Sequence, residues 1–216
     1  MNKFSLIITA GGTSTRYGNN NKLLEIINNK TVIEHTVSAF LGFENITEII
    51  IPTNSNIREQ FRKLFLDNRI NIVENGDSRQ KSVFKALQYV TNDYVIIHDG
   101  ARPLIDQAVI AKTIENVIKY SAVSVMTKTT DTIKEVDENG RIIKTIERTK
   151  LYNTQTPQAF RTDLILKAHN ELKNGNYTDD ASMLEELNIP VYIVNGNYTN
   201  IKITNKSDLD FAKLYI

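Results

Sequence analysis

The sequence contains no cysteine, which excludes disulfide bonds, thiolate nucleophiles and zinc or iron–sulfur sites with cysteine ligands. Its three histidines are scattered along 216 residues, so we do not expect a histidine-rich metal site. No apolar run approaches the ~20 residues that a membrane span needs. The apolar run at residues 4–10 is too short for a signal peptide and leads directly into Gly11 and Gly12. We therefore expect a soluble protein of the cytoplasm.

The chain also lacks a strong excess of either charge. Lys and Arg total 26 and Asp and Glu total 25, which gives a net charge of +1. That balance provides no general electrostatic attraction to nucleic acid or to an anionic membrane, although a local anion site remains possible. We expect neither nucleic acid nor a membrane as a partner. The length suits a single domain, residues 1–216, with a sizeable core.

Short apolar runs alternate with amphipathic stretches over the first 127 residues. The runs are rich in Ile and Val, as in buried parallel strands, and the stretches have helical spacing. This alternation predicts an α/β fold with a mostly parallel, Rossmann-like sheet and helices on both faces. The expected strands are 4–10, 46–52, 70–74, 94–98 and 122–127, and the expected helices are 32–41, 57–65, 82–90 and 107–119.

The pattern changes after Thr127. Two partly polar strands, 132–136 and 141–146, flank a turn that ends in Asn139-Gly140, which is typical of a hairpin. We expect this hairpin to project from the sheet as a β-arm over about residues 127–149. Further on we expect helices at 162–172 and 179–187, strands at 191–194 and 199–204, and a last helix that begins near Ser207.

A glycine-rich turn, Ala10-Gly-Gly-Thr-Ser-Thr-Arg16-Tyr-Gly18, follows the first strand. Ligands of parallel α/β sheets bind beyond the carboxyl ends of the strands, and glycines let backbone N–H groups approach a phosphate closely. Arg16 and Lys22 add charge. A triphosphate cradle and a plain tight turn both explain these residues. The turn matches neither a Walker loop nor Gly-x-Gly-x-x-Gly.

Asp99 ends the expected fourth strand at the same edge of the sheet. A carboxylate there could hold Mg²⁺ beside a nucleotide phosphate, or it could be a loop or capping residue. Arg102 could orient Asp99 or lie on the surface. His98, directly before Asp99, is better explained as a buried structural histidine.

Four further polar segments could serve a site or only the fold. The turn 75–83 could read a base through Ser82, or be a turn with a helix cap. The segment 155–158 contains Pro157 and suggests a fixed turn with a structural role. Thr178-Asp-Asp-Ala-Ser182 could cap a helix or contact a polyol. Lys202 is a lone cation in an apolar frame, which would ordinarily face solvent.

Together these segments resemble the 2-C-methyl-D-erythritol 4-phosphate cytidylyltransferase family of the non-mevalonate isoprenoid pathway. The matching pieces occur in the family's order over nearly the whole chain. They are Ala10-Gly-Gly with Arg16 and Lys22, Gly76–Val83, His98–Pro103, Asp131–Lys134, Gln155–Gln158, Thr178–Ser182 and Asn200–Thr204. The chain has Asn21-Lys22-Leu23 where Pro-Lys-Gln is usual, and it keeps the lysine.

The resemblance implies CMP transfer from CTP to methylerythritol 4-phosphate. Arg16, Lys22 and Lys202 would surround the triphosphate and the reacting phosphate as catalytic cations. Asp99 would hold Mg²⁺ and lie near the substrates. The cytosine and ribose pocket would be lined by Ala10, Gly11, Gly12, Gly76, Asp77 and Ser82.

The resemblance also implies a homodimer. Thr132 and Arg148 would lie on the arm and reach the acceptor in the other subunit, while Thr178 would lie beside the acceptor phosphate. Ribitol 5-phosphate cytidylyltransferases share most of this framework, and a non-catalytic CTP-binding protein is a further alternative. A dinucleotide-binding oxidoreductase fits less well, because the expected second strand ends at Pro52-Thr53 without an acid.

Overall fold

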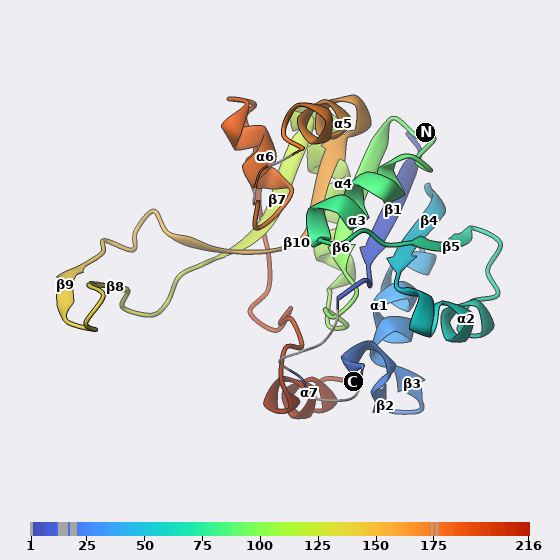
Figure 1. Ribbon diagram of the computed structural model, residues 1–216, viewed down its shortest axis with the longest axis horizontal. Coiled ribbons are helices and arrows are strands. Elements are labelled where there is room, and N and C mark those ends of the chain that lie inside the picture. Colours follow the sequence, from blue (N-terminus) through green and yellow to red (C-terminus); the bar gives the residue numbers. More distant parts are fainter. Residues whose placement is uncertain (1, 13–16, 18–20, 174, 176) are drawn as a thin grey trace.

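The computed structural model describes residues 2–12, 17, 21–173, 175 and 177–216. Within these residues, seven strands form one sheet in the order β11-β7-β10-β6-β1-β4-β5 (Figure 1). Those strands are β1 (Phe4–Thr9), β4 (Ile46–Thr53), β5 (Ile70–Glu74), β6 (Tyr94–Asp99), β7 (Ala122–Lys128), β10 (Tyr152–Arg161) and β11 (Tyr192–Asn195). Two short antiparallel pairs accompany it: β2 (Ile26–Ile27) with β3 (Lys30–Thr31), and β8 (Lys134–Val136) with β9 (Ile142–Thr145).

The sheet is mostly parallel, as the sequence predicts. β1 runs parallel to β4 and β6, while β10 alone among the seven runs antiparallel to its neighbours β6 and β7. The register of β1 and β6 sets Thr9 opposite Asp99, so both strands end at the same edge. The glycine turn after β1 and the Asp99 loop after β6 are thereby brought side by side.

Helices cover both faces of the sheet. Alternate residues of β1 divide between two cores, because Leu6 and Ile8 pack on one face and Ile7 on the other. The first face is covered by α1 (Val32–Leu41), α2 (Ser55–Leu64), α4 (Gln107–Tyr120) and α7 (Lys206–Lys213). The second is covered by α3 (Arg79–Leu87), α5 (Thr162–Glu171) and α6 (Ala181–Glu186). In the described part of the chain, no helix is both long and apolar enough to cross a membrane.

Local sequence signals explain where several helices begin. Thr31 and Glu34 form a capping box at α1, with the Thr31 side chain accepting from the Glu34 N–H. Ser78 caps α3 through the Lys81 N–H, and Asn205 caps α7 through the Asp208 N–H. A 3₁₀ helix, η1 (Lys22–Leu24), follows Asn21, whose side chain accepts from the Leu23 N–H.

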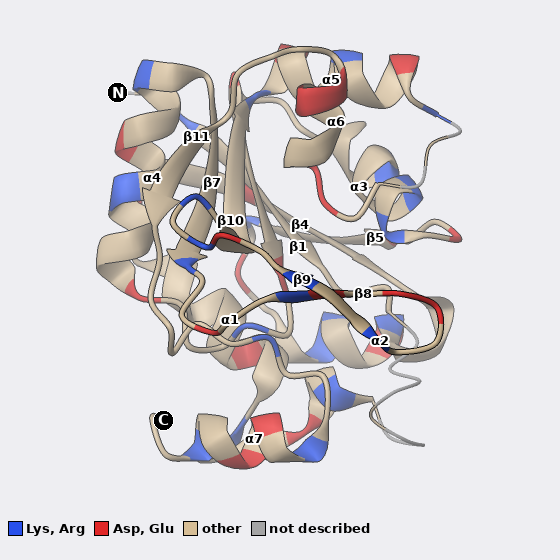
Figure 2. Ribbon diagram, turned by 90° about the vertical axis from the view of Figure 1, so that its left-hand side faces the viewer, with Lys and Arg blue, Asp and Glu red and all other residues tan. Residues whose placement is uncertain are grey.

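The expected hairpin is present as β8 and β9, and it projects far from the sheet (Figure 1). Gly140 in its turn has a φ of +81°, which glycine adopts without strain. The large apolar side chains of the arm are exposed, with Val136 at 52%, Ile142 at 60% and Ile143 at 53%. Charged residues of both signs occur in the hairpin (Figure 2), where Lys144 of β9 pairs with Glu135 of β8 at 3.0 Å. The arm therefore contributes little to the core of its own chain.

The predicted strand at 199–204 is wrong. Asn200 N–H donates to Asn197 O at 3.1 Å, and Ile201 N–H to Thr199 O at 2.7 Å, so the segment begins as a turn. It then runs over the loop after β6, where Ile203 N–H donates to Ala101 O at 2.8 Å. Ile203 is buried there, which accounts for the strand-like apolar pattern.

The predicted turn at 155–158 is also wrong, because these residues lie inside β10. The register of β10 on β7 shifts between Thr154 and Gln158, and this irregularity accommodates Pro157 within a central strand. No strand was predicted at residues 152–161. Because many residues of β10 are polar, its sequence lacks the apolar pattern that predicts a strand between β6 and β7.

Candidate active site

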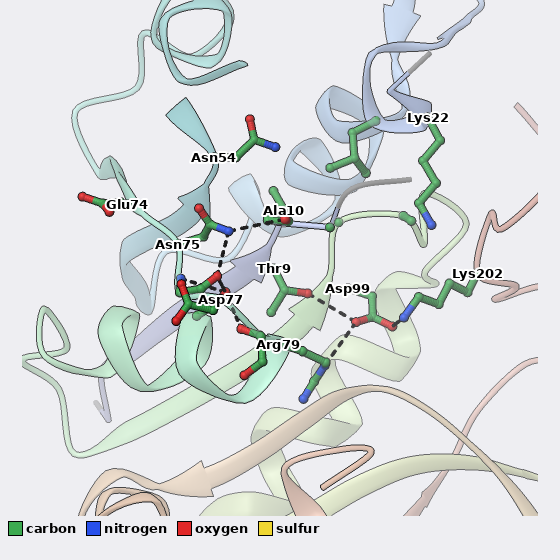
Figure 3. A pocket seen from close by; sticks show the side chains of 18 of the residues that line it. Thr9, Ala10, Lys22, Asn54, Glu74, Asn75, Asp77, Arg79, Asp99 and Lys202 are labelled. Carbon is green, nitrogen blue, oxygen red and sulfur yellow. Dashed lines mark hydrogen bonds and ion pairs between the residues drawn. The ribbon is translucent and has the colours of Figure 1, made fainter. Parts of the chain in front are cut away.

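A cavity of about 700 Å³ opens at the carboxyl ends of β1, β5 and β6. Its walls come from the glycine turn, the loop before α3, the loop after β6 and the segment before α7 (Figure 3). The cavity brings together most of the predicted site residues. They are Ala10, Gly11, Gly12, Lys22, Gly76, Asp77, Ser82, Asp99 and Lys202.

Two glycines at the cavity allow close packing: Gly11 lets its turn approach the loop before α3, and Gly76 lets that loop approach α3. A Cβ on Gly11 would lie 2.8 Å from Asn75, and a Cβ on Gly76 would lie 2.5 Å from the Lys81 Cβ. Asn75 joins the loops, because its Nδ2 donates to Gly76 O at 2.9 Å and to Gly11 O at 3.4 Å. A side chain at Gly11 would force these loops apart, and one at Gly76 would force its loop away from α3.

The loop before α3 is stabilised by its own hydroxyl groups. The Ser82 Oγ donates to Ser78 O at 2.7 Å and accepts from Gly76 N–H at 3.0 Å. Ser82 is thus buried and engaged with the loop, while the Asp77 side chain is 90% exposed at the cavity. Ser78 caps α3, so one of the two explanations given for the turn at 75–83 applies to it. The same turn lines the cavity and is accessible to a ligand there.

Asp99 lies at the centre of a cluster of cations. The Lys202 Nζ is 2.9 Å from Oδ2, the Arg102 Nε is 3.4 Å from Oδ2, and the Arg79 Nε is 3.9 Å from Oδ1. The Thr9 Oγ1 donates to Oδ1 at 3.3 Å. Figure 3 shows Arg79 and Lys202 reaching Asp99 from different sides of the cavity. The cluster combines one carboxylate with three cations, which suits a polyanionic ligand.

Burial and charge act in opposite directions on Asp99. Burial alone would raise the pKa of this carboxyl, but the charges of Lys202, Arg79 and Arg102 outweigh burial and lower the pKa far below its usual range. The carboxylate is therefore ionised at neutral pH. Burial lowers the pKa of the neighbouring His98 to about 4, so this imidazole is neutral.

The loop after β6 holds Lys202 in place. The Arg102 guanidinium donates to Asn200 O at 2.8 Å, and the buried Asn200 amide donates to Thr156 O at 2.9 Å. Lys202 follows two residues later and its ammonium group contacts Asp99, so the alternative of a lysine that only faces solvent does not hold. Arg102 lies where the sequence analysis suggested, beside Asp99.

His98 is a structural histidine, as expected. Its ring is fully buried, with Nδ1 at 3.0 Å from the Thr156 Oγ1 and Nε2 at 3.3 Å from Arg102 O. The Thr156 hydroxyl also accepts from Asp99 N–H at 3.0 Å. His98 thereby helps to fix the end of β6.

The predicted cations lie differently with respect to this cavity. Lys22 lines the cavity from η1. Burial alone would raise the pKa of Asp208, but hydrogen bonds from Thr204 and Asn205 lower it, with a smaller contribution from the charge of Lys22. Arg16 lies outside the described residues. The structure thus places two of the three predicted catalytic cations, Lys22 and Lys202, at one cavity.

The predicted acceptor residues are not brought to this cavity. Thr178 lines a separate hollow of about 400 Å³ with Tyr177 and Ser182. Thr132 and Arg148 are exposed on the arm, where the Arg148 guanidinium donates to Thr130 O. Within one chain, the candidate acceptor residues and the cation cluster are therefore separate.

The sequence analysis missed Arg79 as a site residue. It is the first residue of α3, and besides facing Asp99 it pairs with the buried Asp180 at 2.7 Å. Arg79 follows the polar turn at the sheet edge, and this position is the sequence signal that could have indicated its role. The role of the buried Asn200 in holding this segment to Arg102 and Thr156 was not predicted either.

Among the described residues, no three His, Cys, Asp or Glu side chains gather to hold a metal ion. A ready-made cage is thus absent from this part of the chain. Mg²⁺ commonly binds through one or two carboxylates together with the phosphates of a substrate. Asp99 at the cavity wall fits that arrangement.

Comparison with known proteins identifies the family. The model of the 2-C-methyl-D-erythritol 4-phosphate cytidylyltransferase family matches residues 4–216. The chain belongs to this family. It is 37% identical to the cytidylyltransferase of Bacillus mycoides, over 99% of this chain and 97% of that protein. It is 38% identical to that of Clostridium tetani, over 100% of this chain and 91% of that protein.

Solved structures of the family share the fold. The 4-diphosphocytidyl-2C-methyl-D-erythritol synthase of Anaerococcus prevotii superposes with a TM-score of 0.88 at 31% identity, covering 99% of this chain and 98% of that chain. The cytidylyltransferase of Thermus thermophilus superposes with a TM-score of 0.84 at 27% identity, covering 100% and 98%. The resemblance noted from the motifs is confirmed.

Proposed function

We propose that the chain transfers CMP from CTP to 2-C-methyl-D-erythritol 4-phosphate and releases pyrophosphate. The observation that carries this proposal is the cation cluster around Asp99, at a glycine-lined cavity, in a chain of the cytidylyltransferase family. In this reaction a phosphate oxygen of the acceptor attacks the α-phosphorus of CTP. The bond from that phosphorus to the bridging oxygen breaks, and its electrons leave with pyrophosphate.

The chemistry does not require a general base. The second pKa of a phosphate monoester is ~6, so the nucleophile is mostly dianionic at neutral pH. The obstacle is the repulsion between two polyanions, which positioned cations reduce while they also stabilise the charge of the transition state. We assign this role to Lys202, Lys22 and Arg16.

The glycine turn and the loop before α3 would hold the nucleoside. Both border the cavity, and Gly11 and Gly76 allow close approach of backbone N–H groups. Because Ser82 is engaged with its own loop, we assign it the role of shaping the pocket. The residues proposed to line the cytosine and ribose are Ala10, Gly11, Gly12, Gly76, Asp77 and Ser82.

Asp99 would hold Mg²⁺ together with phosphate oxygens of CTP. When bound, the metal supplies positive charge to the α-phosphoryl group and the leaving pyrophosphate. Lys202 Nζ lies 2.9 Å from the Asp99 Oδ2, which supports a role for its ammonium group beside the reacting phosphate. Asp99 thereby links the proposed metal site to the proposed catalytic lysine.

We also propose a homodimer in which the arm packs on a second subunit. The exposed side chains of Val136, Ile142 and Ile143 support this, because an isolated two-stranded hairpin is only marginally stable. Arg148 and Thr132 would reach the acceptor of the other subunit, with Thr178 beside it. This arrangement explains why Thr132 and Arg148 do not line the Asp99 cavity of their own chain.

The whole chain would act as one cytidylyltransferase domain, residues 1–216, with the arm at about 127–149. The two apolar cores share a single sheet, which supports that assignment. We place the enzyme in the cytoplasm, where CTP is available to it.

The test is pyrophosphate release from CTP with each of two acceptors and with Mg²⁺ present. We expect release with methylerythritol 4-phosphate and little with ribitol 5-phosphate. Equal or greater turnover of ribitol 5-phosphate would overturn the proposed identity of the acceptor, while the proposed reaction, cytidylyl transfer, would stand. CTP binding without release would indicate a binding protein, and full activity with ATP would overturn the choice of nucleotide.

A further inference from the structure

Arg79 is shared between two carboxylates that come from different parts of the chain. One guanidinium nitrogen, Nη2, is 2.7 Å from the Asp180 Oδ2, while Nε is 3.9 Å from the Asp99 Oδ1. The first contact is a short charge-assisted hydrogen bond, and the second is too long for a hydrogen bond. Arg79 is therefore anchored on Asp180 and only faces Asp99.

Asp180 depends on Arg79 for its charge. Its side chain is 1% exposed, and burial alone would raise its pKa, but Arg79 first and His169 next lower it. The second oxygen, Oδ1, has no hydrogen-bond partner, and the nearest histidine nitrogen, the His169 Nε2, is 3.7 Å away. A buried carboxylate without its partner is costly, whereas apolar residues could fill the same space at little cost. Stability alone thus gives a poor reason for this pair.

Asp180 is also fixed to the central sheet. The buried Gln158 of β10 accepts from Asp180 N–H at 3.0 Å and from Ala181 N–H at 3.2 Å through Oε1. Its Nε2 donates to the Asp179 Oδ2 at 2.7 Å and to the Ser124 Oγ at 3.0 Å. The backbone that carries the Asp180 carboxylate is thus held to the sheet.

We propose that Asp180 is a positioning residue that holds Arg79 away from Asp99 and so keeps Asp99 available to Lys202. Arg79 then presents its charge to the cavity, while Lys202 retains the Asp99 Oδ2. Without Asp180, the guanidinium turns to Asp99, because arginine and a carboxylate favour bidentate pairing. Lys202 is displaced and the cation cluster loses its arrangement. The inference rests on the proposed cytidylyl transfer.

Asp180→Asn tests this with nearly the same shape and no charge. We expect kcat for pyrophosphate release to fall on the order of ten- to a hundredfold, since misplaced groups have effects of that size. The affinity for CTP, measured by calorimetry, should change much less. If Asp180 only stabilises the fold, the variant has a lower melting temperature, but its kcat is unchanged at any temperature where it is folded. That outcome would overturn the proposal.

A second measurement follows Lys202 directly and does not depend on activity. Amine acylation read by mass spectrometry should label Lys202 roughly two- to fivefold faster in Asp180→Asn, as expected from loss of an ion pair. Lys206, which is exposed nearby, serves as the internal standard. Unchanged labelling of Lys202 would overturn the displacement of the lysine, even if the wild type failed to release pyrophosphate.

The double variant Arg79→Gln/Asp180→Asn guards against a single variant that does not fold, because it leaves no buried charge unpaired. If Asp180 acts through Arg79, this variant has the kcat of Arg79→Gln. A further loss beyond Arg79→Gln would contradict the proposal.

The matched control is Asp67→Asn, which breaks another Asp–Arg pair. Asp67 lies 2.8 Å from Arg69 beside β5, outside the cavity lining. It should leave kcat and Lys202 labelling unchanged. A fall in kcat equal to that of Asp180→Asn would show that any broken Asp–Arg pair has the effect, and so would overturn the proposal.

Discussion

The strand β1 and the arm use the same residue type in opposite ways. Ile7 and Ile8 in β1 are fully buried, because helices cover both faces of the sheet. Ile142 and Ile143 in the arm are 60% and 53% exposed. A pair of isoleucines therefore does not reveal which surface will cover it. In β1 the partner is the same chain, and for the arm we propose a second copy.

This difference extends to the predicted site residues. Those attached to the sheet edge, such as Asp99 and Gly76, converge on one cavity because the register of the strands fixes where the loops begin. Thr132 and Arg148 are exposed on the arm, and no strand of the sheet fixes their position. Their location relative to a site depends on where the arm packs. The four predictions below separate the two regions.

The largest effect is expected at the sheet edge, from Lys202→Ala. Turnover should fall on the order of 10²–10³-fold, the usual loss for one group that stabilises charge in the transition state. CTP affinity should weaken much less, because other groups of the cavity still bind the nucleotide. Steady-state kinetics and calorimetry measure the two effects. Lys206→Ala, which changes an exposed lysine outside the cavity lining, is the control and should retain normal turnover. Near-normal turnover in Lys202→Ala would remove Lys202 from the chemistry.

The sheet should also make unfolding depend on pH through His98. Its folded pKa is about 4 against 6.5 for the unfolded group, so the unfolded state binds more protons between these values. The stability that His98 contributes is thus complete above pH 6.5 and is lost as the pH falls toward 4. The difference of about 2.5 units corresponds to about 3 kcal/mol.

Urea unfolding at several pH values between 4 and 7 measures this dependence. His98→Gln cannot titrate, so its free energy of unfolding should vary less over the same interval. An identical slope in both proteins would assign the pH dependence to other groups. The arm offers no counterpart, because its titratable side chains are mostly exposed.

Mixing two inactive variants tests whether the arm serves the other subunit. Arg148→Ala and Lys202→Ala homodimers should both be poor enzymes. In a mixed dimer, one site carries both defects and the other carries neither. Random mixing makes half of the dimers mixed, so roughly a quarter of wild-type activity should return on co-refolding.

The comparison is with each variant refolded alone. Native mass spectrometry must show that mixed dimers have formed. If they have formed and activity does not rise, Arg148 acts within its own chain or has no role in the reaction.

The sequence predicted most of the strands and helices because their apolar spacing is produced by packing against the same chain. The expected helix at 32–41 coincides with α1, and its capping box is present. The prediction failed for β10, a central strand that contains polar residues and Pro157. Its polar side chains can be buried there because they bond to residues distant in the sequence, such as Asp179 and Asn200.

The same reason explains the site. Asp99 and Gly76 were found from short motifs at the ends of predicted strands, and the strand order brings them to one cavity. Lys202 was found from the motif at 200–204 and reaches the cavity on a segment that crosses the loop after β6. The motif at 76–83 also contains Arg79, but it does not reveal the partner of this arginine. Its contacts with Asp180 join residues that are 101 positions apart, and no local pattern encodes such a pair.

The smallest effect concerns two glycines, one in each region, that both have open space where a Cβ would be added. Gly140 in the arm has a φ of +81°, whereas Gly42 at the end of α1 has a φ of −73°. An alanine at position 140 would have to adopt this positive φ, which strains its backbone by roughly 1 kcal/mol. An alanine at position 42 would adopt an ordinary negative φ without strain. If the arm becomes ordered only when it packs on a second subunit, the strain at position 140 arises on association and weakens the dimer by a factor of roughly five in dissociation constant, with little change in the melting temperature of the sheet. Sedimentation over a dilution series measures the constant. Equal constants for Gly140→Ala and Gly42→Ala would place the tip of the arm outside the interface, because strain at the tip would then have no bearing on association.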